Sequence, residues 1–295
     1  MRRTAYVHLL LLLVLALSYL LPTASAGAAT VELTTRQATA NIAFTLSADQ
    51  ARQDIRAMAR HADVIGWQEI SNPYQARAID ALDRFNTWWP GGRSASGRPL
   101  MTPRNTNPIS YRSDVWRRVD QGSRLSAPEI EDVSRDRYVS WVVLKHRRSG
   151  RLVARWNVHF VPNAWGDARY RTQLARQEAW TDQARVVRRV HLRLVSRGIP
   201  VFGGGDINRR NVEFIGDVAV YDTLSSGRID NLVHSVTTRI GVADKPSWLP
   251  LNSDHDGLVL PYVVGVDVAV EPASEEPHEP GGNGGGNGNG HGPKP

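Results

Sequence analysis

The chain has no cysteine, and this absence excludes two kinds of chemistry. No disulfide can cross-link the fold, and no thiolate can serve as a nucleophile or as a metal ligand. Any metal that the protein binds must therefore be held by oxygen or by imidazole nitrogen. Lysine is nearly absent as well, so arginine supplies almost all of the 36 basic residues. The basic surfaces of this protein are consequently arginine surfaces.

The charge that is present is unbalanced. The sequence carries 36 Lys and Arg against 29 Asp and Glu, and without its two ends it keeps 33 against 25, a net charge near +8. Guanidinium groups bind phosphate well, and a basic domain attracts polyanions such as nucleic acid or anionic lipid. An arginine-rich genome that places arginine on solvated surfaces explains the same count equally well. Charge alone therefore does not choose a substrate.

The two ends differ from the rest of the chain. Two arginines precede an apolar run from Leu9 to Leu21, and small residues follow at 24–26. This pattern is typical of a cleaved secretory signal peptide over 1–26, with an uncleaved N-terminal anchor as the alternative. Residues 271–295 are rich in Pro and Glu and then in Gly and Asn, a composition that predicts a disordered tail. We expect a secreted protein with one folded domain over 30–270.

Strand and helix patterns alternate through that domain, without repeats. Ser47 and Gln50 form a capping box that predicts a helix start, and Asn72 before Pro73 predicts another. A third helical pattern runs over 167–197 and ends at a glycine. The alternation predicts a single α/β domain. Apolar or alternating runs predict strands over 31–44, 63–67, 109–112, 115–119, 138–146, 152–160, 199–202, 227–233, 236–240 and 257–264.

The run Val201–Asn208 is the most informative strand. It ends in three glycines and then presents Asp206 and Asn208, a carboxylate and an amide two residues apart. Glycine removes side-chain bulk where the backbone must approach something closely. Taken alone, a Gly-Asp sequence is more often an ordinary turn. A functional interpretation needs support from other strands.

That support comes from polar residues that follow other apolar runs. Open α/β sheets bind ligands beyond one set of strand ends, where such groups converge. An oxygen cluster among these residues would suit Mg²⁺ or Mn²⁺, and two histidines would be available for proton transfer. The residues at strand ends are Asn41, Glu69, Asn157, His159, Asp206, Asn208, Asp230, Asp254 and His255.

The order of these residues resembles the endonuclease/exonuclease/phosphatase family, whose fold is called DNase I-like. Seven short motifs occur in the family's order between Asn41 and about Val264, which is far more specific than any single motif. They are Asn41-Ile42, Gln68-Glu69, Tyr111-Arg112, Asn157-Val158-His159, Gly205-Asp206-Ile207-Asn208, Ile229-Asp230 and Ser253-Asp254-His255.

The resemblance implies a four-layer α/β sandwich, in which two packed mixed sheets carry helices on their outer faces. It also implies a divalent-metal site for phosphoester hydrolysis. Glu69 would be the principal Mg²⁺ ligand, with Asn41 and Asp254 nearby. Mn²⁺ and Ca²⁺ are alternative ions.

The resemblance also assigns catalytic roles. Asp206 would orient or deprotonate the attacking water, and Asn208 would hold that water or a phosphate oxygen. His255, oriented by Asp230, would act as a base or a phosphate ligand. His159 would stabilise the phosphorane or assist the leaving group. Which histidine performs which role is left open by the sequence.

Three further residues would contact phosphate or substrate by the same resemblance, namely Asn157, Tyr111 and Arg112. One departure from the family concerns the carboxylate that orients the first histidine, because residues 102–108 contain no acid. Asn105 or Asn107 could replace it.

These observations favour a secreted metal-dependent phosphodiesterase, in the simplest case an extracellular endonuclease acting on DNA or RNA. A sphingomyelinase-like enzyme at a lipid surface and a small-phosphoester phosphatase are alternatives, and a non-catalytic binding protein is a further one. No feature implies a protein partner, and we expect a monomer. Loop tryptophans could stack on bases, insert into lipid or pack on the core, and these are Trp88, Trp89, Trp165 and Trp248.

Overall fold

The computed structural model describes residues 32–165, 171–210, 215, 218–222, 229–236 and 240–265, with the backbone alone for 218–222. The predicted signal peptide over 1–26 and the predicted tail over 271–295 lie outside the described residues. None of the described helices is both long enough and apolar enough to cross a membrane.

The first of two sheets contains the N-terminal strand and the strand that closes the domain. Its order is β11-β13-β1-β2-β4-β3, and β12 also pairs with β13. β1 and β2 are parallel, whereas β1 pairs with β13 in the antiparallel sense from Leu33↔Val264 to Thr39↔Leu258. The strands are β1 (Leu33–Asn41), β2 (Val64–Gln68), β3 (Phe85–Trp88), β4 (Ile109–Arg112), β11 (Ile240–Val242), β12 (Ser247–Leu249) and β13 (Gly257–Val264).

The second sheet has the order β5-β6-β7-β8-β10-β9. It too contains one parallel pair, β7 with β8, among antiparallel neighbours. Each sheet is therefore mixed, as predicted. The strands are β5 (Trp116–Ala127), β6 (Arg137–His146), β7 (Leu152–His159), β8 (Val201–Asp206), β9 (Val218–Asp222) and β10 (Asp230–Ser235).

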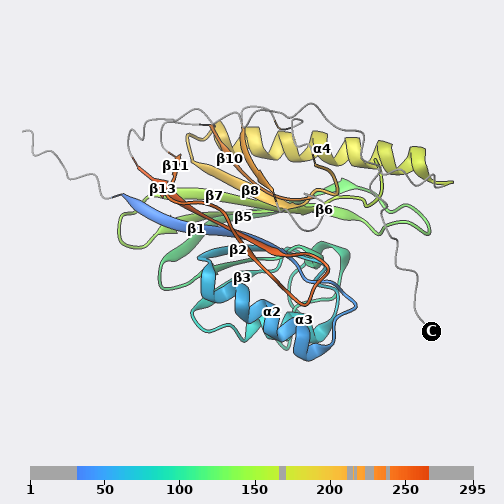
Figure 1. Ribbon diagram of the computed structural model, residues 1–295, viewed down its shortest axis with the longest axis horizontal. Coiled ribbons are helices and arrows are strands. Elements are labelled where there is room, and N and C mark those ends of the chain that lie inside the picture. Colours follow the sequence, from blue (N-terminus) through green and yellow to red (C-terminus); the bar gives the residue numbers. More distant parts are fainter. Residues whose placement is uncertain are drawn as a thin grey trace, which may run out of the picture. The chain divides into compact units, whose positions relative to one another are not determined.

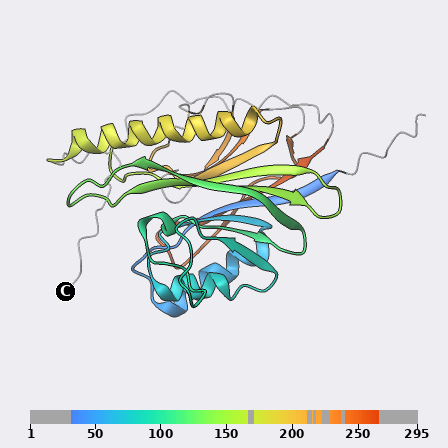
Figure 2. The same ribbon diagram turned by 180° about the vertical axis from the view of Figure 1, so that it is seen from behind.

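Helices cover the outer faces of both sheets (Figure 1, and from behind in Figure 2). α2 (Ala48–His61) and α3 (Pro73–Asp80) lie on the first sheet, and α4 (Gln173–Val195) lies on the second; a short 3₁₀ helix, η1 (Pro103–Thr106), precedes β4. The predicted four-layer α/β sandwich is confirmed. The crossovers α2 and α4 connect the strands of the two parallel pairs, β1 to β2 and β7 to β8.

The helix ends follow the local chemistry of the sequence. The Ser47 side chain accepts the Gln50 N–H (3.3 Å), and the Gln50 side chain accepts the Ser47 N–H (3.1 Å), so the predicted capping box is present. At α3, the Asn72 N–H donates to Gln75 Oε1 (3.0 Å). Gly198, three residues past α4, has φ 67°, a left-handed conformation that glycine adopts without strain.

Two strand predictions need correction. The strand predicted over 227–233 overlaps β10 of the second sheet, whereas the strand predicted over 236–240 shares only Ile240 with β11 of the first sheet, and residues 237–239 lie outside the described residues. The apolar side chain of Ile240 packs with Tyr262 and Leu260 in the core, because β11 pairs with β13. The strand predicted over 115–119 extends to Ala127. Apolar patterns show that a strand exists, whereas its partner depends on the completed core.

The glycines of β8 are required by the close packing of this strand. A Cβ on Gly203 would lie 1.8 Å from the Trp156 ring. Gly204 and Gly205 both have φ 144°, and their Cβ atoms would lie 2.0 Å and 1.9 Å from backbone oxygens of the neighbouring strands β10 and β7. The predicted close approach is therefore to the protein's own core and backbone.

A buried arginine links the two sheets. Arg155 on β7 is fully buried, and it donates from Nη2 to Ala38 O of β1 (3.0 Å) and from Nη1 to Trp156 O (2.8 Å). Burial lowers the pKa of Arg155 to about 9. A bond from one sheet to a backbone carbonyl of the other helps to fix how the layers face each other.

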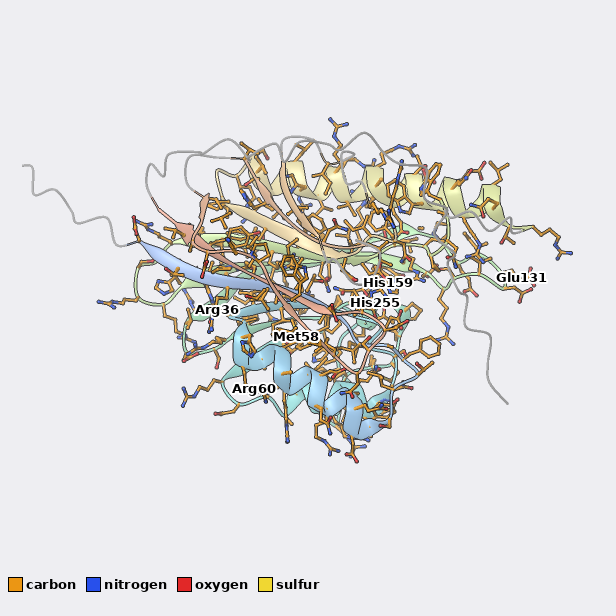
Figure 3. All side chains as sticks on the ribbon, in the orientation of Figure 1. Arg36, Met58, Arg60, Glu131, His159 and His255 are labelled. Atoms are coloured by element: carbon orange, nitrogen blue, oxygen red, sulfur yellow. The ribbon has the colours of Figure 1, made fainter. Side chains whose placement is uncertain are left out.

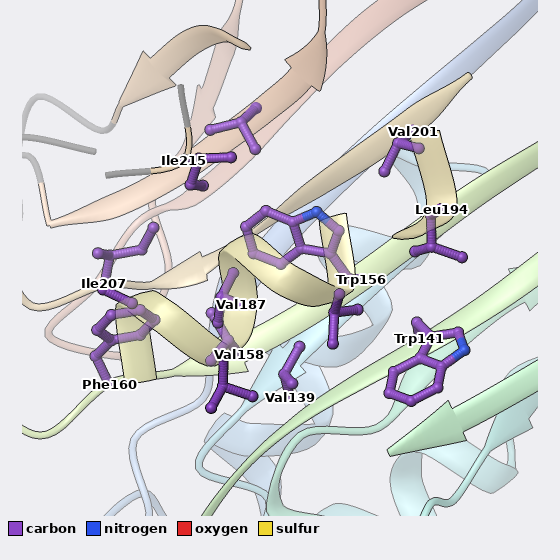
Figure 4. Close-up of a cluster of buried hydrophobic side chains, with 14 of the residues drawn as sticks. Val139, Trp141, Trp156, Val158, Phe160, Val187, Leu194, Val201, Ile207 and Ile215 are labelled. Atoms are coloured by element: carbon purple, nitrogen blue, oxygen red, sulfur yellow. The ribbon is translucent and has the colours of Figure 1, made fainter. Parts of the chain in front are cut away.

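A buried histidine makes folding stability depend on pH. His191 on α4 accepts from Trp156 Nε1 (3.2 Å) within the core beneath α4, where Trp156 lies among apolar side chains (Figure 4). Burial lowers the pKa of His191 from 6.5 to about 4. As the pH falls, the unfolded chain therefore takes up this proton at a higher pH than the folded chain does. The free energy of unfolding is unaffected by His191 above pH 6.5 and decreases as the pH falls from 6.5 towards 4. We expect this loss to reach about 3 kcal/mol.

Equilibrium unfolding by guanidinium chloride at pH 7.5 and pH 4 measures this loss of stability. His191→Gln keeps an acceptor for Trp156 but cannot titrate, so its stability should fall by about 3 kcal/mol less than that of the wild type between these pH values. His61→Gln, at an exposed position on α2, should retain the wild-type difference. An equal pH dependence in His191→Gln and the wild type would contradict the prediction.

Candidate active site

The two parallel strand pairs end at one place and together deliver polar groups. Asn41 ends β1 opposite Gln68 of β2, and His159 ends β7 opposite Asp206 of β8. Asn41 is fully buried, and its Nδ2 donates to Glu69 Oε1 (3.1 Å) and to Asp206 Oδ2 (3.1 Å). One amide therefore connects the carboxylates of the two sheets.

Asp206 is the centre of this group. Its side chain is 2% exposed, its Oδ2 lies 3.3 Å from His159 Nε2, and its Oδ1 accepts the Asn208 N–H (2.9 Å). Burial raises the pKa of Asp206, but the charges of His159 and His255 and the Asn208 N–H outweigh burial and leave the pKa below its ordinary value. Asp206 is therefore an ionised carboxylate in a nearly dry position.

His255 forms the second half of the arrangement. Its Nδ1 lies 2.6 Å from Oδ2 of Asp230, which is buried and pairs with Asp206 across β10 and β8. Burial lowers the pKa of His255, but Asp230, Asp206 and Asp254 outweigh it and raise the pKa to about 10. His255 is thus a cation at neutral pH in the metal-free protein. The side chains of His159 and His255 lie close together between the layers (Figure 3).

Glu69 and Asn208 have unusual backbones. Their φ angles are 61° and 53°, in the left-handed region that non-glycine residues seldom adopt. Glu69 Oε2 accepts the Phe44 N–H (3.1 Å), and Glu69 Oε1 lies 4.0 Å from His159 Nε2. Such conformations cost about 1–3 kcal/mol each and are frequent at functional sites. Here they occur at the first residue after β2 and at the second residue after β8.

The oxygen atoms around Asn41 suit a divalent cation. Among the described residues, Asn41 Oδ1 is buried without a hydrogen-bond partner, and it belongs to the same side chain that contacts the Glu69 and Asp206 carboxylates. Carboxylate and amide oxygens are the ligands that Mg²⁺, Mn²⁺ and Ca²⁺ prefer. These residues therefore fit the predicted cofactor.

A second set of possible metal ligands consists of Asp206, Asp230 and His255, whose ligand atoms lie within 4.8 Å of one another. The short bond between Asp230 and His255 already occupies one atom of each. Asp254, predicted as a ligand beside Glu69, is exposed, and its Oδ1 accepts from Ser253 Oγ (3.4 Å). The charge of Asp254 helps to raise the pKa of His255, so this carboxylate interacts with the site through that histidine.

Tyr111 and Arg112 lie at the opposite end of the first sheet. β4 is antiparallel to β2, so Tyr111 pairs with Val64 at the start of β2, far from Gln68 at its end. Arg112 forms ion pairs with Asp114 and Asp63 (2.5 and 3.5 Å). Burial raises the pKa of the Tyr111 hydroxyl. The predicted substrate contacts of these two residues are not supported by their location.

The predicted role of Asn157 also changes. Its Oδ1 accepts from Gln68 Nε2 (2.6 Å), and its Nδ2 donates to Trp67 O (2.8 Å) and Pro108 O (3.1 Å). All of its polar atoms are used between the sheets. Asn157 therefore positions the end of β2, from which Glu69 emerges.

Neither predicted substitute for the missing carboxylate is bonded to His159 within the described residues. Asn105 bonds to the backbone of Gly91, Gly92 and Leu100, which organises the loop before β4. Asn107 Nδ2 donates to Tyr138 O (3.2 Å). His159 is instead placed by its own contact with Asp206.

The sequence analysis missed Asp54, a positioning residue on α2. Asp54 is buried and accepts from the Asn252 N–H (2.9 Å) and the Ser253 N–H (3.1 Å). Ser253 Oγ in turn donates to Asn41 O (2.8 Å). These bonds hold the loop that carries His255. An acid beside Ile55 in the apolar stripe of α2 was the available signal.

Arg137, at the start of β6, was missed as well. Burial lowers the pKa of Arg137, and the charges of Asp206 and Glu69 oppose that effect. Its Nε donates to Ser134 Oγ (2.6 Å). A guanidinium that interacts with both site carboxylates adds an anion-binding group. No motif distinguishes it from the many other arginines.

The loop tryptophans divide into two kinds. Trp89 is 2% exposed and donates from Nε1 to Asp80 Oδ1 (3.0 Å), and Trp88 is covered by Arg118 at 4.9 Å. Residues 88 and 89 therefore do not form the exposed apolar hairpin that a lipid enzyme would need. Trp165 and Trp248 remain exposed, by 44% and 37%.

Comparison with known proteins finds similar structures but no similar sequences among family models and curated proteins. No protein-family model matches the sequence, and no curated protein matches it. Among solved structures, an endonuclease/exonuclease/phosphatase from Bacteroides vulgatus is similar with a TM-score of 0.59 and 18% identity, over 79% of this chain and 99% of that one. The identity is low, so the similarity concerns the fold.

Two other similar structures differ in what their names describe. A mannosyl-6-phosphatase from Bacteroides thetaiotaomicron has a TM-score of 0.54 and 18% identity, over 79% of this chain and 99% of that one. D. rerio TDP2 complexed with a single-strand DNA product has a TM-score of 0.56 and 15% identity, over 78% of this chain and 98% of that one. One architecture therefore occurs with a sugar phosphatase and with a protein solved bound to DNA.

Proposed function

We propose, from the endonuclease/exonuclease/phosphatase fold that this chain adopts, that the protein is a divalent-metal-dependent phosphoric ester hydrolase, and that its substrate is nucleic acid. The observation that carries the proposal is the position of Asp206. This buried, ionised carboxylate lies 3.3 Å from His159 Nε2, interacts with the His255 cation, and is joined through Asn41 to Glu69.

The charges of the site suit in-line attack of water on phosphorus. Asp206 would accept a proton from water as the new P–O bond forms, and His159 would assist protonation of the leaving oxygen as the ester P–O bond breaks. The His255 cation, held by Asp230, would stabilise negative charge on the phosphoryl oxygens, and Arg137 would add to that stabilisation. Asn208 Nδ2 is bonded to Phe160 O (3.1 Å), so this amide is held in place beside Asp206.

Glu69 and Asn41 would hold a Mg²⁺ ion, which would neutralise phosphate charge and polarise the P–O bond. A non-catalytic binding protein would have no need for an ionised, buried acid between two histidines. Burial of charged groups carries a desolvation cost, and clusters of such groups with shifted pKa values occur preferentially at functional sites.

Several observations favour nucleic acid over other phosphoesters. The domain is basic and its positive charge is almost entirely arginine, which suits repeated phosphates. A similar fold has been solved with a single-strand DNA product. A small-phosphoester phosphatase is the second candidate, because another similar structure is a sugar phosphatase. The apolar run and small residues before residue 27 support secretion as part of the proposal.

A substrate panel tests this proposal. The purified protein is assayed on plasmid DNA, RNA, sphingomyelin and mannose 6-phosphate, with Mg²⁺ or with EDTA. We expect metal-dependent cleavage of DNA or RNA. Glu69→Gln should require about 10- to 100-fold more Mg²⁺ for half-maximal rate. Glu131→Gln, at an exposed loop position away from the histidines (Figure 3), is the matched control and should behave as wild type.

The same panel separates the alternatives. Cleavage of sphingomyelin or mannose 6-phosphate without cleavage of nucleic acid would overturn the substrate class. Absence of metal-dependent hydrolysis on all four substrates would overturn the enzymatic proposal.

A further inference from the structure

An exposed aromatic side chain stacks with an arginine beside the site. Trp165 lies in the loop that follows β7 and is 44% exposed. The guanidinium carbon of Arg209 lies 4.7 Å from the centroid of the Trp165 ring and 5.1 Å from that of Trp180. A cation over an indole face is a favourable contact, and here it leaves much of the Trp165 ring accessible.

Buried neighbours hold this stack in place. The rings of Trp165 and Trp180 meet edge to face, with centroids 5.9 Å apart and planes at 87°. Trp180 is 4% exposed, donates from Nε1 to Ile207 O (2.9 Å), and contacts Phe160 with ring centroids 5.1 Å apart. An exposed ring backed by a buried one is rigid, so binding to it costs little conformational entropy.

The residues that form and support this stack are close in sequence to the catalytic groups. Arg209 directly follows Asn208, and Phe160 directly follows His159. Asn208 Nδ2 donates to Phe160 O (3.1 Å), which joins the two segments. A ligand on Trp165 would therefore lie on the side of the site from which the chain continues after His159 and Asn208.

We propose that Trp165 and Arg209 form a nucleotide subsite next to the scissile phosphate, in which the indole stacks on an unpaired base and the guanidinium binds the adjoining phosphate. This deepens the proposed function, on which it rests, and names single-stranded nucleic acid as the substrate class. Along a strand, each base has a phosphate beside it, and here the Trp165 indole has the Arg209 guanidinium beside it. Every base has a face that can stack on an indole. A base inside a duplex is stacked on both faces, so it must leave the stack before it can bind to Trp165.

A lipid surface is the competing occupant. Leu174, 68% exposed at the start of α4, lies near this loop, since Gln173 Nε2 donates to Ala164 O. Insertion of Trp165 into hydrocarbon would carry the stacked guanidinium of Arg209 with it, and a buried charge is costly. When the Trp165 indole stacks on a base, the Arg209 guanidinium can instead bind the adjoining phosphate.

A ratio of specificity constants tests the subsite. kcat/KM is measured for a single-stranded oligonucleotide and for an abasic deoxyribose phosphate oligomer of the same length, which carries no aromatic ring. Trp165→Ala should lower the ratio of the first to the second about 10- to 100-fold, as expected for the loss of one stacked base. Trp165→Phe should restore most of it. Trp248→Ala, at a comparably exposed tryptophan on β12, should keep the wild-type ratio.

Other results would overturn the subsite. A ratio that is unchanged in Trp165→Ala, whether neither kcat/KM falls or both fall equally, would show that the stack serves only the fold. A loss of binding to anionic vesicles with an unchanged ratio would assign Trp165 to a membrane. If the wild type hydrolyses neither substrate, the proposed function fails, and oligonucleotide binding by fluorescence anisotropy still tests whether Trp165→Ala weakens affinity about tenfold.

Discussion

Replacing Asp206 with asparagine should lower kcat for nucleic acid by about 10³-fold, the typical contribution of a positioned acid or base. The substitution keeps the size of the side chain but removes the negative charge between His159 and His255. An amide at this position cannot accept a proton from water. Plasmid relaxation and oligonucleotide cleavage at saturating Mg²⁺ would measure the loss.

The matched control is Asp182→Asn, because Asp182 is a half-exposed residue of α4 that pairs only with Arg185 among the described residues. It should leave kcat unchanged. Thermal melting of both variants shows whether the fold is retained. A folded Asp206→Asn enzyme with more than a tenth of wild-type kcat would remove Asp206 from the mechanism.

Replacing Gly204 with alanine should prevent formation of a stable second sheet. The new Cβ would lie 2.0 Å from Asn231 O on β10, at a φ of 144° that alanine does not adopt. Both the carbonyl and the strand are fixed by the sheet, so the clash cannot be relieved by a side-chain rotation. We expect a loss of at least about 4 kcal/mol in the free energy of unfolding, or no folded protein at all.

Gly198→Ala provides the comparison for this prediction. Gly198 also has a positive φ, 67°, but no atom lies within 4 Å of an added Cβ. Its replacement should cost only about 1 kcal/mol, the strain of a left-handed alanine. Urea unfolding of the two variants distinguishes steric clash from backbone strain. Similar losses in both would contradict the role assigned to close strand contact.

Local signals in the sequence were sufficient for the helix starts and for most strands but missed β3, β9 and β12, and the four layers were implied by the family resemblance. Ser47 with Gln50 marks a helix start because its hydrogen bonds are made within three residues. Apolar runs locate β2, β7 and β8 because burial on both faces leaves a continuous apolar pattern. Strand pairing is a non-local property, and so the pairing of β11 with β13 could not be read from the sequence of residues 236–240. The burial of Trp89 was likewise decided by the assembled core.

The candidate site could be predicted from the sequence as far as its groups lie at the ends of parallel strands. Asn41, His159 and Asp206 end the parallel pairs, and they meet as predicted. Tyr111, whose substrate contact was implied by the resemblance, lies at the other end of the sheet because β4 is antiparallel to β2, and the four residues of β4 do not encode that direction. Arg137 is near the carboxylates only because of how the sheets face each other, and no local pattern reports that.

The pairing of β1 with β13 has a consequence for when activity can appear. The first and last strands of the domain lie side by side, so the first sheet is incomplete until nearly the whole domain has been synthesised. His255 also lies in this last segment, just before β13. A growing chain on the ribosome thus has neither a finished sheet nor its second histidine. Any activity that needs His255 can therefore begin only after β13 has been synthesised and has paired with β1.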